Sequence, residues 1–206
     1  MPPRNRSRHA GVPHEVRIVG GQWKRTRLAV PDKPGLRPTP DRVRETLFNW
    51  LGQDLTGWRC VDAFAGTGAL GLEAASRGAS DVLLVEHDAD LVAQLRANQA
   101  RLNAAALRVQ RGNGVTALAG LPPASVDLVF LDPPFDAGLY DKALAATTPA
   151  LAPDGLVYLE APSAWDDRLL APHGLELVRH LRAGAVHAHL LRRHNAAQQS
   201  ANPTAG

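Results

Sequence analysis

The residues Asp132-Pro133-Pro134-Phe135 are the part of the chain whose types and spacing best suit chemistry. They follow an apolar run, 126–131, that is typical of a buried strand in a parallel sheet. Ligands of open α/β sheets bind outside the carboxyl ends of the strands, so we expect the tetrapeptide at such a site. The Asp132 carboxylate and a nearby backbone carbonyl can accept the protons of a planar amino group. The two prolines stiffen the loop and remove two donors, and Phe135 can stack on a base or plug the core. The alternative is a plain strand-ending turn, because Pro and Asp are common in turns.

A second candidate site is the glycine turn Gly66-Thr67-Gly68-Ala69-Leu70-Gly71. It follows an apolar strand and opens a helix, and Glu86 comes about 20 residues later, which is the pattern of a dinucleotide-binding turn. In such sites backbone N–H groups approach the ligand and the acidic residue binds ribose hydroxyls. Asp62 beside the turn favours a ligand with an ammonium group, such as S-adenosylmethionine, and opposes the pyrophosphate of NAD.

Both sites carry resemblances to known motifs. Residues 61–68, Val-Asp-Ala-Phe-Ala-Gly-Thr-Gly, resemble the first motif of the Rossmann-like methyltransferases. A strand that ends in Asp-Pro-Pro-Phe resembles the motif of amino-group methyltransferases that act on nucleic acid bases. Asn113 follows a later strand and could hydrogen-bond adenine, although many methyltransferases carry Asp there and a helix N-cap is the alternative. The resemblance implies S-adenosylmethionine as the cofactor, with the binding residues Asp62, Ala63, Phe64, Gly66, Gly68, Glu86, Asn113 and Asp132, and the catalytic residues Asp132, Pro133, Pro134 and Phe135.

The composition sets limits on the class of protein. The chain has 206 residues, of which 45% are hydrophobic, which suits one sizeable core and is too little for two full domains. No stretch reaches the roughly 18 apolar residues of a membrane span, and the basic, Pro-rich start lacks the apolar region of a secretory signal. The single cysteine, Cys60, excludes an internal disulfide, and the eight histidines lack the spacing of metal ligands. We therefore expect a cytoplasmic protein with no metal and no membrane contact.

Positive charge is concentrated at the start of the chain. Residues 1–44 hold 11 of the 23 Lys and Arg and 3 of the 20 Asp and Glu, for a net charge of +8, whereas the remainder carries −5. This asymmetry indicates an arm that binds a polyanion. For Arg42 and Arg44, pairing with Asp41 or Glu45 is an equally good explanation, and Trp23 could equally pack in the core. The expected RNA-binding residues are Arg17, Trp23, Lys24, Arg25, Arg27, Arg37, Arg42 and Arg44.

The order of elements predicts an α/β fold. Residues 16–19 and 26–30 form a β-hairpin with a basic turn, and a helix capped by Thr39 or Asp41 follows to about residue 51. Strands at 60–64, 82–86, 107–111, 126–131 and 156–160 alternate with helices at 69–77, 88–103, 115–118 and 139–151. Runs at 175–181 and 186–191 form a terminal hairpin. With the resemblance, this implies a Rossmann-like class I SAM-dependent methyltransferase whose mostly parallel seven-stranded sheet ends in an antiparallel hairpin, with an N-terminal β-hairpin extension. The expected division is a disordered basic tail (1–13), the RNA-binding extension (14–39), the methyltransferase domain (40–193) and a disordered tail (194–206).

Three segments near the start carry a more specific resemblance. They are Val-Arg-Ile-Val-Gly-Gly-Gln-Trp-Lys (16–24), Pro-Gly-Leu-Arg-Pro-Thr (34–39) and Asp-Arg-Val-Arg-Glu-Thr-Leu-Phe-Asn-Trp-Leu (41–51). Together with both catalytic motifs, the chain resembles the RsmD family over about residues 15–193. Enzymes of that family methylate the N2 amino group of a guanine in bacterial 16S ribosomal RNA. The resemblance implies guanine 966 as the target, within a 30S subunit or an assembly intermediate. A monomer is the default expectation for the oligomeric state.

The expected reaction is methyl transfer from the sulfonium of S-adenosylmethionine to guanine N2. Asp132 and the Pro133 carbonyl would accept the amino protons, and Phe135 would stack on an unstacked base. A DNA adenine or cytosine amino methyltransferase is one alternative, although the chain leaves no room for a target-recognition domain. A noncatalytic RNA-binding assembly factor is another, and the carboxylates Asp62, Glu86 and Asp132 argue against it. A nicotinamide-dependent dehydrogenase is the third, opposed by Asp62.

Overall fold

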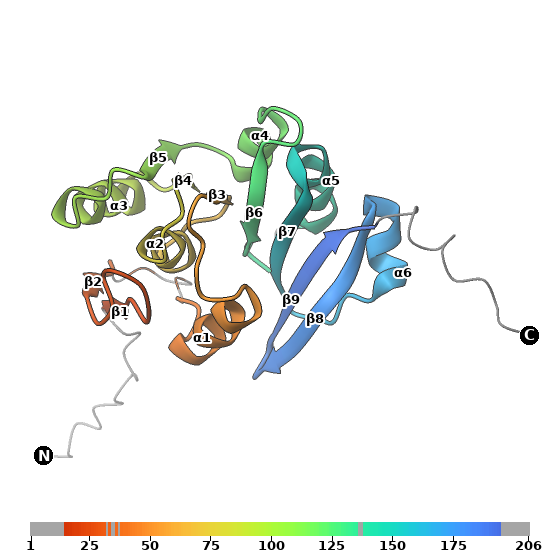
Figure 1. Ribbon diagram of the computed structural model, residues 1–206, viewed down its shortest axis with the longest axis horizontal. Helices are drawn as coiled ribbons and strands as arrows, with labels where there is room; N and C mark the ends of the chain where they lie inside the picture. The colour runs from red at the N-terminus through yellow and green to blue at the C-terminus, as the bar shows by residue number, and fades with distance from the viewer. Residues whose placement is uncertain (1–14, 32, 34–35, 37, 136–137, 195–206) are drawn as a thin grey trace, which may run out of the picture.

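The computed structural model describes residues 15–31, 33, 36, 38–135 and 138–194. Its centre is a seven-stranded sheet in the order β5-β4-β3-β6-β7-β9-β8 (Figure 1). Strands β3 (Arg59–Asp62), β4 (Asp81–Glu86), β5 (Leu107–Arg111), β6 (Val126–Leu131) and β7 (Leu151–Ala161) are parallel, whereas β8 (Leu175–Ala183) and β9 (Val186–Arg193) form the antiparallel hairpin at one edge. The predicted mostly parallel sheet with a terminal hairpin is confirmed.

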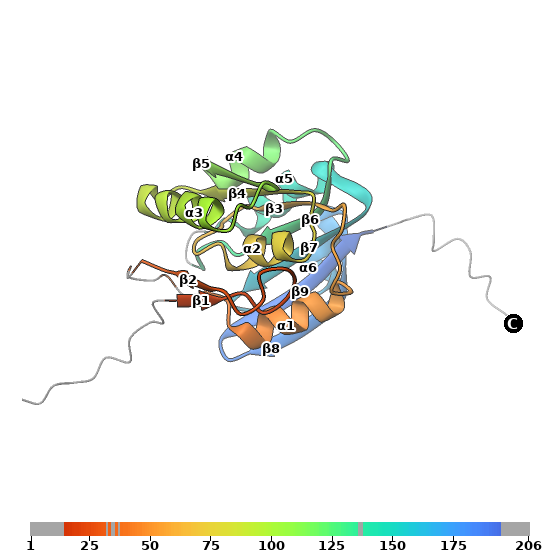
Figure 2. The ribbon, with the colours of Figure 1, turned by 60° about the vertical axis from the view of Figure 1, so that its left-hand side comes forward.

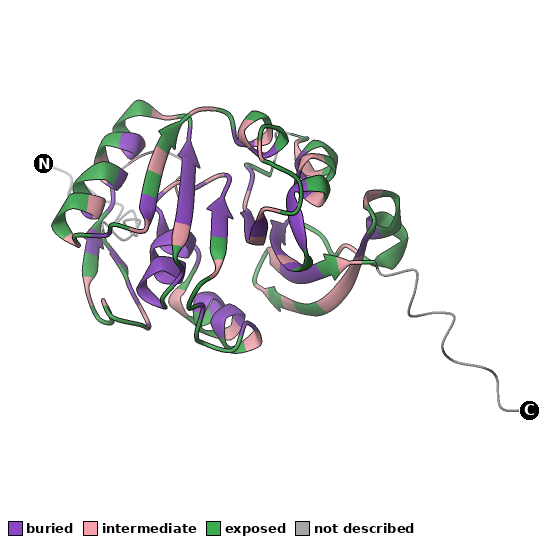
Figure 3. Ribbon diagram, turned by 45° about the horizontal axis from the view of Figure 1, so that its top comes forward, coloured by how far each residue is buried: buried purple, intermediate pink, exposed green. Residues whose placement is uncertain are grey.

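Two apolar layers sandwich the sheet, because alternate residues of each central strand point to opposite faces. One layer joins α1 (Asp41–Trp50) and α2 (Ala69–Ser76) to the sheet, with Leu95 of α3 (Ala89–Arg101) at its border. The other layer joins the sheet to α4 (Gly114–Ala119), α5 (Tyr140–Ala150) and the short α6 (Asp167–Leu170), which continues into a 3-10 turn at Ala171–His173. The central strands are therefore buried along most of their length (Figure 3).

The start of the chain is part of the same core. Strands β1 (Glu15–Arg17) and β2 (Arg27–Ala29) form the predicted antiparallel hairpin, which lies beside α1 and α2 in both views (Figures 1 and 2). Its inward side chains, Val16, Ile18, Leu28 and Val30, are at most 6% exposed and belong to the α1–α2 layer. The boundary proposed at residue 39 stays a prediction, but the described part of the hairpin shares one hydrophobic core with the rest of the chain.

Two local expectations differ from the structure. Helix α1 begins after Pro40 without a side-chain cap, because the Thr39 hydroxyl bonds to Glu160 and the Asp41 carboxylate pairs with two arginines. Strand β7 begins at Leu151, not at residue 156, because Leu151 already pairs with Val126 of β6. The next pair joins Leu128 to Leu156, so residues 152–155 of β7, where the turn was expected, form a bulge within the strand. The described residues include no helix of the length and apolarity that a membrane span requires.

The expected tails at 1–13 and 195–206 lie outside the described residues, as does Arg37. Asp88, which we expected to open a helix, caps α3 by accepting hydrogen bonds from the Asp90 and Leu91 N–H groups. This bond fixes where α3 starts relative to the end of β4. Glu86, the last residue of β4, is thereby held beside the first turn of the helix.

Candidate active site

Three carboxylates, Asp62, Asp132 and Glu160, lie on one face at the carboxyl ends of three adjacent strands. Asp62 ends β3 and is paired in register with Phe130 of β6, two residues before Asp132. Leu131 of β6 is paired with Leu159 of β7, so Asp132 and Glu160 are the next residues on neighbouring strands. Because residues two apart on a strand share a face, all three side chains belong to the α1–α2 side of the sheet.

Asp62 is 1% exposed and has one unsatisfied oxygen. Its Oδ2 accepts a hydrogen bond from the Gly71 N–H at 3.0 Å, whereas Oδ1 has no partner among the described residues. Burial raises the pKa of Asp62 to about 7; the Glu86 charge adds to this rise, and the Gly71 and Phe64 N–H groups partly offset it. An ammonium group would satisfy the free oxygen and stabilise the charged form, so the site fits an amino-acid end of a cofactor.

Asp132 is half-buried in the same face. Burial, followed by the charges of Glu160 and Asp62, raises the pKa of Asp132 well above its usual range. Pro133 after it is buried and Pro134 is exposed. Phe135 is 41% exposed, so it does not plug the core. Among the described residues, Leu169 is the other large hydrophobic side chain that is exposed. The tetrapeptide thus places one acceptor at the sheet end and one aromatic ring at the surface.

The glycine turn is closed by Glu86. One carboxylate oxygen of Glu86 accepts from the Gly66 N–H at 2.9 Å and the other from the Asp88 N–H at 2.8 Å. Gly68 has a φ of +79°, which favours glycine, and a Cβ on Gly71 would lie 2.1 Å from Leu84. The turn is therefore held against β4 without side chains that would fill the space in front of it.

The remaining expected cofactor residues have additional structural roles. Asn113 is exposed and caps α4 through a 3.0 Å bond from the Thr116 N–H, which is the alternative that the sequence left open. Its contact with adenine stays a prediction. Ala63 is buried, and Phe64 is half-buried against the α4–α5 layer. A cofactor would therefore meet the backbone of Ala63 rather than its methyl group.

A segment of the N-terminal region reaches this edge of the sheet. The Lys33 ammonium donates to both carboxylate oxygens of Asp88, at 2.5 and 2.6 Å, and lies 2.8 Å from Asp90. The Leu36 side chain lies 3.6 Å from the position that a Cβ on Gly66 would occupy. Lys33 thus lies at the start of α3, and Leu36 lies beside the glycine turn.

The expected RNA-binding residues fall into two groups. Lys24, Arg25, Arg27 and Arg42 are exposed, and Arg27 makes a surface ion pair with Glu15 at 3.2 Å. Arg17 pairs with Asp41 at 2.6 Å, and Trp23 is half-buried against the α1–α2 layer. The described turn between β1 and β2 is a basic, solvent-facing surface, as the sequence indicated.

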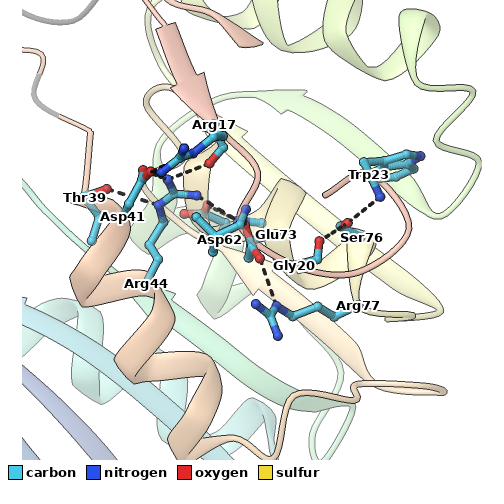
Figure 4. Close-up of polar contacts among 12 residues, drawn as sticks. Arg17, Gly20, Trp23, Thr39, Asp41, Arg44, Asp62, Glu73, Ser76 and Arg77 are labelled. Atoms are coloured by element: carbon cyan, nitrogen blue, oxygen red, sulfur yellow. Dashed lines mark hydrogen bonds and ion pairs between the residues drawn. The ribbon is translucent and has the colours of Figure 1, made fainter. Parts of the chain in front are cut away.

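The expectation that Arg44 contacts RNA is wrong. Arg44 is 1% exposed and pairs with Glu73 at 3.3 Å and Asp41 at 2.5 Å (Figure 4). It also donates to the carbonyls of Thr39 and Arg17. These acceptors satisfy the hydrogen-bond donors of the Arg44 guanidinium. Arg44 therefore has the structural role that the sequence had left open for it.

Two buried acidic residues, Glu73 and Glu160, were not predicted from the sequence. Glu73 is fully buried in α2, pairs with Arg44 and Arg77, and accepts the Val19 N–H at 2.8 Å. Glu160 is 4% exposed, and its Oε1 accepts from the Thr39 and Tyr158 hydroxyls at 2.9 Å each. The available signal was an acidic residue in an otherwise apolar element, whereas Asp62 was predicted from its place beside the glycine turn.

The strand order, the glycine turn after β3, the acid at the end of β4 and the acceptor loop after β6 together define a class I methyltransferase of Rossmann-like fold. A family model described as "Conserved hypothetical protein 95" matches residues 16–192. The ribosomal RNA small subunit methyltransferase D of Escherichia coli K12 is 48% identical over 151 residues, covering 71% of this chain and 75% of that protein. The protein of the same name from Haemophilus influenzae is 37% identical over 177 residues, covering 84% and 91%.

A solved structure agrees with these relatives. An Escherichia coli protein described as a candidate methyltransferase superposes with a TM-score of 0.76 at 41% identity, covering 87% of this chain and 98% of that one. The chain belongs to the ribosomal RNA small subunit methyltransferase D family. It is a methyltransferase.

Proposed function

We propose that the protein transfers a methyl group from S-adenosylmethionine to the N2 amino group of a guanine in 16S ribosomal RNA, guanine 966 by family resemblance. The observation that carries the proposal is the placement of Asp132 beside Asp62 on one sheet face, at the ends of adjacent strands. One carboxylate is suited to the cofactor and the other to the amino group that receives the methyl. The names of the relatives support ribosomal RNA as the substrate.

The cofactor residues have separable tasks. The free Oδ1 of Asp62 binds the ammonium group, and Glu86 binds ribose hydroxyls while it holds the Gly66 N–H. The backbone of Ala63, Phe64 and Gly68 lines the turn, and Asn113 contacts the adenine. When bound, S-adenosylmethionine supplies an electrophilic methyl group. Asp62 would hold the cofactor on the same sheet face as Asp132, because the two acids end neighbouring strands.

The acceptor loop orients the target base. Asp132 and the Pro133 carbonyl would accept the two N2 protons, which favours a pyramidal nitrogen whose lone pair faces the methyl group to be transferred. Asp132 does not need to be a strong base, since the nitrogen loses its proton readily once it carries a positive charge. A preorganised acceptor in a desolvated site supplies most of the rate enhancement. Pro134 keeps the loop stiff, and the exposed Phe135 stacks on the base.

The basic surface of the N-terminal hairpin binds the RNA backbone. Lys24, Arg25, Arg27 and Arg42 are exposed and available to phosphates, and Arg17 can exchange its pairing with Asp41 for one. Arg37, outside the described residues, and the edge of Trp23 extend this surface. The substrate is RNA within a 30S subunit or an assembly intermediate, modified in the cytoplasm by a monomer.

The direct test is transfer of radiolabelled methyl groups to 30S subunits that lack the modification, followed by nucleoside analysis. We expect the label in N2-methylguanosine from 16S RNA, and label in another nucleoside would refute the proposal. Asp132→Ala should abolish transfer while cofactor affinity stays within a few-fold. Full activity in that variant would remove Asp132 from the mechanism.

A further inference from the structure

We infer that Glu160 reads the N1–H of the target guanine and thereby determines which base is methylated. The inference rests on the proposed function and extends it, because that function assigns acceptors only to the N2 amino group. Glu160 would be a specificity-determining residue, and Thr39 and Tyr158 would position it.

The strand register places Glu160 where a second acceptor is needed. Leu131 and Leu159 are paired in the parallel β6–β7 ladder, so Asp132 and Glu160 extend side by side beyond this pair. Phe130 and Tyr158 come two residues before Asp132 and Glu160 and therefore lie on the same face of the sheet. The centroids of their rings are 6.3 Å apart. Glu160 therefore lies beside the acceptor of the amino group.

The hydrogen bonds of Glu160 leave one oxygen available. Thr39 and Tyr158 both donate to Oε1, at 2.9 Å each, and both hydroxyls come from buried residues. Among the described residues no hydrogen bond involves Oε2. Two donors on a single oxygen fix the orientation of the carboxylate, so the other oxygen is presented in a defined direction.

The three carboxylates lack the partners that buried acids normally have. Glu73 in the same layer has Arg44 and Arg77, whereas the described residues offer no ion pair to Asp62, Asp132 or Glu160. No group of three or more acidic, His or Cys side chains in the described part of the chain could hold a metal ion. Asp62 Oδ1 and the buried hydroxyl of Tyr140 also have no partner there. An unpaired acidic site of this kind needs a ligand that is rich in hydrogen-bond donors.

The edge of guanine supplies those donors in the required pattern. Its N1–H and N2 amino group are adjacent, so three protons face Glu160, Asp132 and the Pro133 carbonyl. Adenine and cytosine present an unprotonated ring nitrogen next to their amino groups. A carboxylate facing that nitrogen would meet a lone pair instead of a proton and would remain unsatisfied. Glu160 therefore favours guanine over adenine and cytosine, which also carry an amino group but have no proton on the adjacent ring nitrogen.

The sharpest test replaces the target guanine by 2,6-diaminopurine in 16S RNA that is reconstituted into 30S subunits. This base keeps the 2-amino group, but its N1 is an acceptor. The wild-type protein should prefer guanine about 10- to 100-fold in kcat/KM, the range of one well-formed polar contact to a base. In Glu160→Gln the two hydroxyls keep the side-chain oxygen at the Oε1 position, which places an NH2 group at the Oε2 position. The preference should shift at least about tenfold toward 2,6-diaminopurine.

Matched variants separate this inference from its alternatives. Glu176→Gln makes the same chemical change at the Arg192 pair on the terminal hairpin and should leave the ratio unchanged. Tyr158→Phe and Thr39→Val keep the Glu160 charge but release Oε1, and each should reduce the guanine preference about threefold or more. An unchanged ratio in active Glu160→Gln protein overturns the inference. If that variant does not fold or turn over, an unchanged ratio in both positioning variants overturns it. Failure of the wild-type protein to methylate guanine N2 would refute the proposed function instead.

Discussion

The hydroxyl of Thr39 donates a 2.9 Å hydrogen bond to Glu160, 121 positions later in the chain. Thr39 immediately precedes α1, and its carbonyl accepts from Arg44, whose guanidinium reaches Glu73. The segment that carries the basic surface is thus connected through buried polar groups to the end of β7. Variants along this path should affect stability and activity in separable ways.

Arg44→Met should destabilise the protein by about 3–5 kcal/mol, because it leaves Glu73 buried with one of its two arginines missing. Chemical denaturation measures the change. Arg42→Ala on the exposed side of the same helix should change stability by less than about 0.5 kcal/mol. The proposed function predicts that Arg42→Ala instead weakens RNA binding. Equal losses of stability in the two variants would contradict the assignment of Arg44 to the fold.

Asp62→Asn should give a stability difference that depends on pH. The folded-state pKa of Asp62 is raised from 3.8 to about 7, so the folded protein binds this proton more tightly than the unfolded chain. Wild-type stability should therefore fall relative to the variant as pH rises from about 4 to 7, by on the order of 1.4 kcal/mol per pH unit at most. Denaturant unfolding at pH 5 and pH 8 measures this trend.

Asp127→Asn is the control of opposite sign. The Arg59 guanidinium lowers the pKa of Asp127, so its stabilising contribution is present at neutral pH and is lost as pH falls through the folded-state pKa. The two variants should diverge in opposite directions between pH 3 and 7. Parallel pH trends would show that the Asp62 carboxyl is not the titrating group. Asp62→Asn alone should also lower cofactor affinity about tenfold or more, measured by calorimetry.

Methyl transfer should increase with pH up to a plateau, because Asp132 accepts protons only as a carboxylate and its pKa is raised. The Glu160 charge contributes to that rise. Glu160→Gln removes this charge and should move the acidic limb of the kcat/KM profile to lower pH. Single-turnover rates from pH 5 to 9 measure both profiles. An acidic limb at the same pH in the two proteins would show that the limb reports another group.

The triple variant Lys24→Ala, Arg25→Ala, Arg27→Ala should weaken RNA binding and reduce its dependence on salt, by about 0.7–0.9 in log–log slope for each phosphate that the protein no longer neutralises. Filter binding at several salt concentrations measures the slope. Removal of Arg59 and Arg108, which pair with Asp127 and Asp81 at the amino ends of the strands, takes away two positive charges, against three in the triple variant. An equal loss of RNA affinity in this control would indicate a general charge effect.

Periodicity in the sequence predicted the elements that depend on local pattern. The bounds of β5 and β6 and the Asp88 cap of α3 agree with the structure. The cap of α1 failed because Thr39 has a partner on β7 that no local pattern reveals. The extra length of β7 depends on the pairing of Leu151 with Val126 of β6, which the local sequence pattern does not reveal.

Local sequence pattern also predicted only part of the candidate site. Asp62 and Asp132 were predictable because each adjoins a recognisable loop. Glu160 joins them only through the parallel register of β6 and β7, which is a property of the folded sheet. Arg44 looked like a surface charge because the sequence does not show that α2 presents Glu73 to it.

The hairpin at residues 15–30 contributes Val16, Ile18, Leu28 and Val30 to the common core. Its deletion would uncover apolar surface of α1 and α2, so truncation is a poor way to assay RNA affinity. Grafting this hairpin onto a related catalytic body would require that body to supply the matching faces of both helices together with an acid at the position of Glu73. Retargeting the enzyme by exchanging the hairpin alone would therefore yield a misfolded chimera, whereas point changes on the outer side of its turn leave the scaffold intact.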